Sequence, residues 1–158
     1  MKRRGINMLE RLLVPSDGSD TSRKAARYAR GLAGLSGGRV TLLGVINRRA
    51  FIGEPTMSPA ETPARIVEPL EDFLRQAAEK EMRELEKIGE EKGVETNLAI
   101  RYGDLVEEIV RQAEKERADL IVMGSHGKSA LAAAFLGSVT FGVVHKDTKI
   151  PVLIVRRS

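Results

Sequence analysis

Short apolar segments alternate along this chain with segments of helical periodicity, and that alternation limits the fold more than any other feature. The apolar segments are 12–14, 39–46, 96–103, 119–124 and 151–157. Helical patterns cover 20–35, 64–93, a segment that begins after Asp104 as its cap, and 138–146. This order predicts an α/β protein with a parallel sheet covered by helices on both faces through right-handed crossovers. Ligands of such sheets bind beyond the carboxyl ends of the strands, which directs attention to the loops after the first and fourth segments.

Composition and charge exclude several classes of function. The 158 residues suit a single domain, 1–158, and include no cysteine, no tryptophan and two histidines, so thiol chemistry, aromatic base stacking and a histidine-rich metal site are not expected. The net charge of +4 reflects basic residues near the ends, which we interpret as solvated tails with no nucleic-acid partner. No membrane partner is expected, because the longest apolar run, 130–136, is too short to span a bilayer. Glu10 and Arg11 interrupt what would be the apolar stretch of a signal peptide, so we expect a cytoplasmic protein. Residues 47–63 hold three of the six prolines, and we expect them to form a long mobile loop.

The stretch "MGSHGKSALAAAFLGSVT", residues 123–140, contains Gly127-Lys128-Ser129, which looks like the end of a P-loop. A P-loop requires a glycine six residues before its lysine, and Val122 stands there instead. The P-loop interpretation is therefore excluded.

The same stretch has the spacing Gly124-x-x-Gly127, nine residues, Gly137-Ser138. Glycines at a strand end allow backbone amides to approach a ligand closely, and Gly137 to Thr140 would open a helix whose N-terminus favours an anion. The hydroxyls of Ser138 and Thr140 could bond phosphate oxygens. The alternative is that the glycines only form a turn and Ser138 only caps a helix, and the spacing leaves both open.

These motifs resemble the ATP-binding branch of the universal stress protein family along essentially the whole chain. The matching segments are "LLVPSDGSD", "MGSHG", "LGSVT" and "PVLIV". The resemblance implies a Rossmann-like five-stranded parallel sheet of order 3-2-1-4-5 and a site for ATP, ADP or AMP, with Mg²⁺ as a companion. The nucleotide-binding residues that it implies are Pro15, Asp17, Val45, Met123, Gly124, Gly127, Gly137, Ser138, Val139 and Thr140.

Within that resemblance, Asp17 and Val45 would hold the nucleoside, and Met123 would lie against the sugar or base. Gly127 and residues 137–140 would cradle the phosphates. Asp17 could bond ribose hydroxyls or help to hold Mg²⁺, or it could simply bond its own turn. Gly44 departs from the family pattern, in which a histidine often precedes the matching valine.

Several other polar residues near these motifs could contribute to the site. Lys128 could contact a terminal phosphate, or it could be solvated. Arg48 and Arg49 could close over a ligand from their loop. His126 has no acidic partner evident in the sequence, so a catalytic role is not expected.

The expected function is a cytoplasmic adenine-nucleotide sensor in the stress response, with no more than weak ATP hydrolysis. A slow ATPase or phosphotransferase, and a nucleotide-free dimeric interaction module, remain alternatives. The segment 151–157 would form an exposed sheet edge, and the resemblance implies that it pairs with a second copy in a homodimer.

Overall fold

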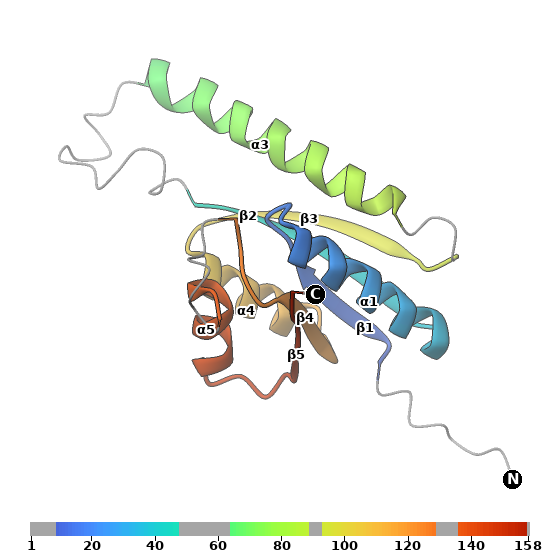
Figure 1. Cartoon of the computed structure of the whole chain (residues 1–158). Helices are drawn as coiled ribbons and strands as arrows, with labels where there is room; N and C mark the ends of the chain where they lie inside the picture. Colours follow the sequence, from blue (N-terminus) through green and yellow to red (C-terminus); the bar gives the residue numbers. More distant parts are fainter. Residues whose placement is uncertain (1–8, 48–63, 89–92, 129–135, 158) are drawn as a thin grey trace, which may run out of the picture.

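The computed structural model describes residues 9–47, 64–88, 93–128 and 136–157 of the chain. Its elements are β1 (Arg11–Pro15), α1 (Asp20–Ser36), β2 (Arg39–Ile46), α3 (Ala64–Lys87), β3 (Thr96–Tyr102), α4 (Leu105–Lys115), β4 (Leu120–Gly124), α5 (Ser138–His145) and β5 (Val152–Val155) (Figure 1). Outside the described residues lie all but the first residue of the predicted loop 47–63, the paired arginines at 48 and 49, and most of the apolar run 130–136.

The five strands form one parallel sheet of order β3-β2-β1-β4-β5. This confirms both the α/β class and the strand order expected from the sequence. The central strand β1 lies opposite Val40 and Leu42 of β2 through Leu12 and Val14, and it pairs on its other side with β4. The order reverses between β1 and β4, so the loops after these two strands diverge and leave room for a ligand.

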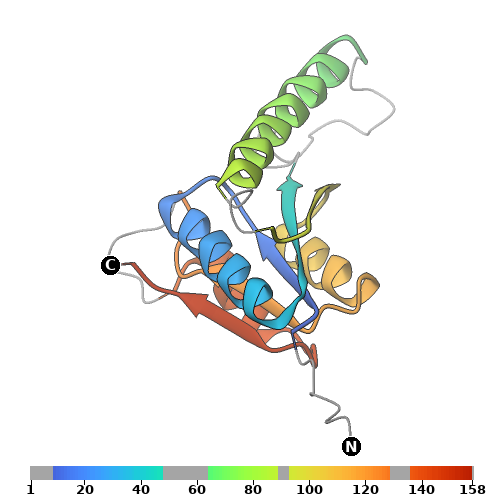
Figure 2. The ribbon, with the colours of Figure 1, turned by 90° about the vertical axis from the view of Figure 1, so that its right-hand side faces the viewer.

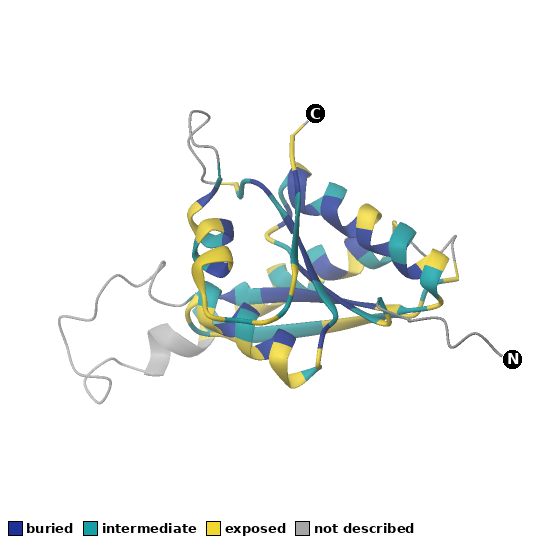
Figure 3. Ribbon diagram, turned by 90° about the horizontal axis from the view of Figure 1, so that it is seen from below, coloured by how far each residue is buried: buried dark blue, intermediate teal, exposed yellow. Residues whose placement is uncertain are grey.

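Helices cover both faces of the sheet, and Figure 2 shows α1 and α4 on opposite sides of β1. One core cluster joins the alanines of α1, Met82 and Leu85 of α3, and Leu12 and Val14 of β1. The other cluster joins Leu13 and Ile121 to α4 and α5. Buried residues accordingly concentrate on the strands and on the inward faces of the helices (Figure 3). Helices thus cover both faces of the sheet, which leaves its carboxyl edge as the place where a ligand can bind.

The ends of the helices follow local sequence signals. Helix α1 begins after Ser19, whose side chain accepts a hydrogen bond from the Ser22 amide, and it ends at Gly37, which has a φ of 71°. Helix α4 begins after Asp104, whose carboxylate accepts from the Glu107 amide. None of the helices in the described part of the chain combines the length and the apolar character needed to cross a membrane.

The long helix was predicted incorrectly in two respects. It was expected to continue to Gly93, but α3 ends at Lys87, close to the helix-disfavouring glycine at 89. Its expected apolar stripe was Val67, Leu70, Phe73 or Leu74, Ala77, Leu85 and Ile88. The stripe is correct at Leu85, which is buried, and wrong at Ala77 and Ile88, which are exposed. Phe73 is 67% exposed and Leu74 is half-buried, while Met82, outside the stripe, is buried. Residues 78, 82 and 85 have the four- and three-residue spacing of one helical face, and this face covers β2.

One buried arginine joins α1 to the end of α3. Arg30 is 1% exposed, and its guanidinium donates to the carbonyl oxygens of Leu85 and, at 2.9 Å, of Glu86. Carbonyl groups in the last turn of a helix have no partner within the helix, and they favour a positive charge. Arg30 therefore caps α3 from its neighbour and fixes the position of α3 over the sheet.

Candidate functional site

The loop after β1 is organised around the carboxylate of Asp17. One oxygen accepts the Ser19 amide at 3.0 Å, which makes a local turn, and the other accepts the Lys128 amide at 2.9 Å. Lys128 belongs to the loop after β4. Asp17 therefore does form the turn contact that was one alternative, and it also links the two loops that flank the switch point of the sheet.

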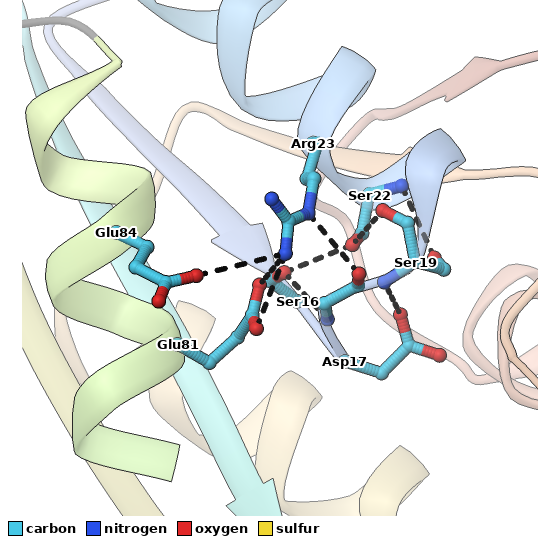
Figure 4. Close-up of polar contacts among 8 residues, drawn as sticks. Ser16, Asp17, Ser19, Ser22, Arg23, Glu81 and Glu84 are labelled. Atoms are coloured by element: carbon cyan, nitrogen blue, oxygen red, sulfur yellow. Dashed lines mark hydrogen bonds and ion pairs between the residues drawn. The ribbon is translucent and has the colours of Figure 1, made fainter. Parts of the chain in front are cut away.

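The same loop is held from behind by α1 and α3, as Figure 4 shows. Gly18 has a φ of 77°, and its carbonyl accepts from Arg23 Nε at 3.2 Å. The Arg23 guanidinium also contacts Glu81 of α3 at 3.0 Å. Ser16 Oγ lies 2.9 Å from Ser22 Oγ and accepts the Gly18 amide at 3.2 Å. These contacts fix the backbone conformation of residues 16–18 and so the position of Asp17.

The glycines of the loop after β4 are required by close approach. A Cβ on Gly124 would lie 2.6 Å from Thr21 Oγ1 and 2.9 Å from the Ser22 amide nitrogen, so only glycine allows β4 to end against α1. A Cβ on Gly127 would lie 2.7 Å from Asp17 Oδ2, and one on Gly137 would lie 3.3 Å from the Cα of the residue before Gly127. The spacing seen in the sequence therefore brings three backbone segments together.

Helix α5 starts at this loop with its first amides uncapped by any side chain. Gly137 is the N-cap, and it makes no side-chain cap hydrogen bond, while its own amide donates to Ser125 O at 2.7 Å. The amides that follow it have no partner within the helix, so they can donate to an anion. Thr140 is buried and donates its hydroxyl to Gly124 O at 2.8 Å, so this hydroxyl anchors α5. Ser138 is exposed at the helix start, and its hydroxyl is available to a ligand.

These loops enclose a cavity of about 180 Å³, and all ten residues expected to bind nucleotide line it. They are Pro15, Asp17, Val45, Met123, Gly124, Gly127, Gly137, Ser138, Val139 and Thr140. Lys128 does not line this cavity and lies on a neighbouring groove. The structure thus gathers residues from four separate segments of the chain around one hollow.

The cavity also has walls that the sequence interpretation did not include. They are Ser16, Ser19, Ser22, Leu43, Leu105, Ile109 and His126. Leu43, Ile109 and Met123, with Val45 packed against them, belong to one hydrophobic cluster, and this part of the lining is called the apolar end of the cavity. The glycines and Ser138 contribute polar lining. Leu105 and Ile109 come from α4, which begins directly after β3. Because β3 is parallel to the other strands, the start of α4 lies at the carboxyl edge of the sheet, and this placement could have identified the two residues from the sequence.

The departure from the family pattern at Gly44 does not affect this cavity. A Cβ at Gly44 would meet Ala78, Met82 and Ile100, each at 3.8 Å. The position therefore faces α3, whereas Val45, the next residue along β2, lines the cavity.

Asp17 is ionised over most of the pH range. Partial burial of the carboxyl acts to raise its pKa, but hydrogen bonds from Ser19, Lys128 and Ser22 outweigh this effect and leave the pKa below its ordinary value of 3.8. A carboxylate has about four lone-pair sites, so Asp17 can accept further hydrogen bonds from a ligand while it holds both loops.

His126 and possible metal ligands add little chemistry of their own. His126 Nδ1 lies 2.9 Å from Ser125 Oγ, and its carbonyl oxygen accepts from Thr21 Oγ1. Across the described ranges, no group of three or more His, Asp or Glu side chains is arranged to hold a metal ion. What the site offers is backbone amides, several hydroxyls, one carboxylate and an apolar end, a set of groups suited to binding a ligand.

The fold and the cavity together define a doubly wound α/β protein with a cavity at its topological switch point, where proteins of this class bind ligands. The chain belongs to the universal stress protein family, whose family model matches residues 8–156.

Several relatives are similar over nearly the whole chain. Universal stress protein MJ0531 of Methanocaldococcus jannaschii is 34% identical, over 98% of this chain and 86% of its own length. MJ0577 of the same organism is 35% identical over 95% of this chain and 96% of its own length. The solved structure of MJ0577 has a TM-score of 0.82 and covers 96% of this chain and 98% of that one. A universal stress protein solved in complex with cAMP has 26% identity and a TM-score of 0.63, with coverage of 92% of this chain and 95% of that one.

Proposed function

We propose that the protein binds an adenine nucleotide in this cavity and acts in the cytoplasm as a nucleotide sensor of the stress response. The observation that carries the proposal is the start of α5. Its amides are left without a side-chain cap beside Gly127 and the exposed hydroxyl of Ser138. Such a group of donors at a helix N-terminus suits a phosphate.

The residues divide between the parts of a nucleotide. The apolar end, with Val45 and Met123, suits a base and the face of a sugar. Asp17 lies between the loops, where its carboxylate can accept from ribose hydroxyls. The amides of residues 138–140 and the Ser138 hydroxyl suit the first phosphates. A universal stress protein crystallised in complex with cAMP supports a nucleotide as the ligand.

Any Mg²⁺ would be held mainly by the nucleotide itself. Asp17 is the carboxylate that lines the cavity, and Mg²⁺ is commonly bound through one or two carboxylates together with phosphate oxygens. The ion would screen the phosphates, and the chain would contribute Asp17 to its shell.

The first test is to denature the purified protein and identify released small molecules by mass spectrometry, followed by calorimetry with AMP, ADP and ATP, with and without Mg²⁺. The proposal expects a released adenine nucleotide or saturable binding. Absence of both would contradict it and favour a nucleotide-free interaction module. Phosphate release from bound ATP would instead favour the slow ATPase or phosphotransferase.

A single hydroxyl tests the placement of the phosphate. Ser138→Ala removes one donor to a charged group, so we expect AMP to bind about tenfold more weakly. Adenosine has no phosphate, and its affinity should be unchanged. Equal losses for AMP and adenosine would show that the phosphate does not lie at the start of α5.

We also propose that two copies associate along β5. Within the described residues β5 pairs only with β4, through bonds such as Ile121 N to Pro151 O and Ser125 N to Val155 O. Residues 151, 153 and 155 therefore direct their backbone groups toward β4, and Val152 and Ile154 direct theirs toward the open edge.

Two proline substitutions distinguish an effect on the proposed dimer interface from an effect on the stability of the subunit. Ile154→Pro removes an outward amide, so it should convert a dimer to a folded monomer in light scattering. Leu153→Pro removes an amide of the β4–β5 ladder and should destabilise the subunit itself. A wild-type chain that is monomeric at high concentration would contradict the proposed homodimer.

A further inference from the structure

The outward face of helix α1 carries two adjoining hollows that lie outside the nucleotide cavity. The first, of about 650 Å³, is formed by the start of α1, the loop after β4 and the segment after β5. The second, of about 500 Å³, lies further along α1. Lys24 and Arg27 line both hollows, which therefore form one continuous surface, called the α1 surface below. Figure 2 shows α1 in front of the sheet, and none of the described helices or strands lies over its outward face.

Hydrogen bonds close the wall between the α1 surface and the nucleotide cavity. The Lys128 amide donates to the Asp17 carboxylate at 2.9 Å. The hydroxyls of Ser19 and Thr21 both donate to the carbonyl oxygen of His126. These bonds join the loop after β4 to the loop after β1 and to the first turn of α1. A ligand of the α1 surface is therefore separate from a nucleotide in the cavity.

The hollow at the start of α1 is strongly basic, and we call it the basic groove. Asp20 is the one acidic residue among its described lining residues, and the cationic ones are Lys24, Arg27, Lys128 and Arg157. Among the residues that the structure describes, the side chains of Arg27, Lys128 and Arg157 make no ion pair. Lys24 Nζ donates to the carbonyl oxygen of Arg156 at 3.1 Å, which holds the ammonium group beside the chain after β5. A hollow lined by uncompensated charges of one sign attracts groups of the opposite sign.

Beyond the basic groove, the α1 surface becomes apolar. Tyr28 is 53% exposed, Leu35 is 89% exposed, and Leu32 is half-buried between them. Gly31 faces open space, because a Cβ on it would meet no atom of the described chain within 4 Å. Residues 28, 31 and 35 recur with three- and four-residue spacing, so they share one face of the helix. Apolar side chains that gather on an outward face are typical of a site for another molecule.

The order of the two parts indicates the kind of ligand. A nucleic acid carries a phosphate at every step of its backbone, so it needs positive charge along the whole surface. Here the positive charge ends at Arg27, and the surface continues with Tyr28 and Gly31. A peptide segment can match both parts, because carboxylates and apolar side chains can follow one another along one chain.

We propose that the α1 surface binds a segment of a partner protein in which acidic residues adjoin apolar ones. The acidic residues lie in the basic groove, and the apolar residues pack on Tyr28, Gly31 and Leu35. Gly31 leaves room for a side chain of the partner between the two larger residues. The inference goes beyond the proposed nucleotide site and does not depend on it.

Fluorescence anisotropy with labelled peptides tests the inference. The probe has a run of glutamates followed by the residues Leu-Phe-Ala-Leu. One reference peptide replaces its glutamates by glutamine, and the other replaces its apolar residues by serine. Wild type should bind the probe about tenfold more tightly than either reference peptide.

Two double variants separate the parts of the surface. Arg27→Gln/Arg157→Gln should weaken binding of the probe by about three- to tenfold, as expected for the loss of two exposed ion pairs, and should leave the glutamine reference unchanged. Tyr28→Ser/Leu35→Ser should weaken the probe by about tenfold, because an aromatic anchor is lost, and should leave the serine reference unchanged. All four side chains are exposed, and thermal unfolding verifies that both variants fold.

The matched control is Arg39→Gln/Arg83→Gln, which removes the same charge from two exposed positions outside the α1 surface. It should bind the probe as wild type does. Equal affinities for the three peptides, or equal losses in the groove variant and this control, overturn the inference.

Competition and light scattering distinguish other occupants from the proposed one. AMP should not displace the probe, and displacement would overturn the inference by placing the probe in the nucleotide cavity. A change of oligomeric state in either surface variant would also overturn it, because this face would then be a contact between copies of the chain. So would a single-stranded oligonucleotide that binds more tightly than the probe and is weakened only in the groove variant. If the probe binds as expected and no nucleotide binds, the proposed function fails and this inference stands.

Discussion

Gly124 and Gly127 stand three residues apart in one loop, and the same substitution should lower stability at the first and nucleotide affinity at the second. Neither has a positive φ, so alanine is permitted by the backbone at both positions, and the outcome depends on what the new methyl group meets. At Gly124 the Cβ would lie within 2.9 Å of three atoms in the first turn of α1, two of them backbone atoms. At Gly127, Asp17 is the one described residue that it would meet, with the carboxylate oxygen at 2.7 Å and Cγ at 3.8 Å.

The stability cost of each substitution depends on which neighbouring atoms can move to make room for the new methyl group. Relief of the Gly124 clash requires α1 to shift from β4, and overpacking of this kind costs about 1–3 kcal/mol. We expect the upper end, because fully buried residues of α1, such as Ala25, pack directly behind this turn. For a chain of this size that corresponds to a fall in Tm of roughly 6–12 °C. At Gly127 the carboxylate can rotate, so Gly127→Ala loses about 1 kcal/mol with the Lys128 hydrogen bond and regains about 0.4–1 kcal/mol from the unfolded state.

Urea unfolding and nucleotide calorimetry on the two variants provide the assay. Gly127→Ala should unfold within about 1 kcal/mol of wild type, and it should bind nucleotide at least about tenfold more weakly, because the methyl group displaces Asp17 and narrows the cavity. Gly124→Ala should be clearly destabilised. Wild-type affinity in Gly127→Ala would refute the assignment of the site, and wild-type stability in Gly124→Ala would refute the packing argument.

Three further substitutions test individual contacts. Asp17→Asn should cost stability near neutral pH, and the difference from wild type should disappear in urea titrations as the pH falls below 3.8, since the pKa of Asp17 in the folded state lies below that value. Arg30→Met leaves two carbonyl groups at the end of α3 without their donor, so unfolding free energy should fall by about 2–4 kcal/mol, and a change below about 0.5 kcal/mol would contradict its capping role. Glu81→Gln should cost less than about 1 kcal/mol, and the cost should shrink in high salt, because the pair with Arg23 is partly solvated.

The order of the elements could be predicted because each strand and helix has its own local pattern. Segment 39–46 is a strand with the predicted bounds, and Asp104 caps a helix as its side chain suggested. The phase of α3 could not be predicted in this way. Its sequence offers apolar residues on more than one face, and only the packing of Met82 against the sheet selects the buried one.

The residues of the candidate site likewise fall into those that a local sequence pattern reveals and those that it does not. Gly124, Gly127 and Gly137 could be found from their spacing, because close backbone approach demands glycine in a fixed register. The contribution of α4 could not, since Leu105 and Ile109 look like ordinary core positions of a helix. Nor does any local pattern reveal that Arg23 of α1 would meet α3 and so support the turn that carries Asp17.

The central position of β1 also constrains how the chain can fold. The first strand of the sheet is joined to β4 by very distant contacts: the Asp119 carboxylate accepts from the amides of Glu10 and Arg11, 109 and 108 residues away. Pairings of such high contact order are formed slowly. During synthesis β1, β2 and β3 can assemble first, with one edge of β1 open until β4 leaves the ribosome. We therefore expect this half-sheet to be the intermediate most exposed to aggregation, and the docking of β4 to limit the folding rate.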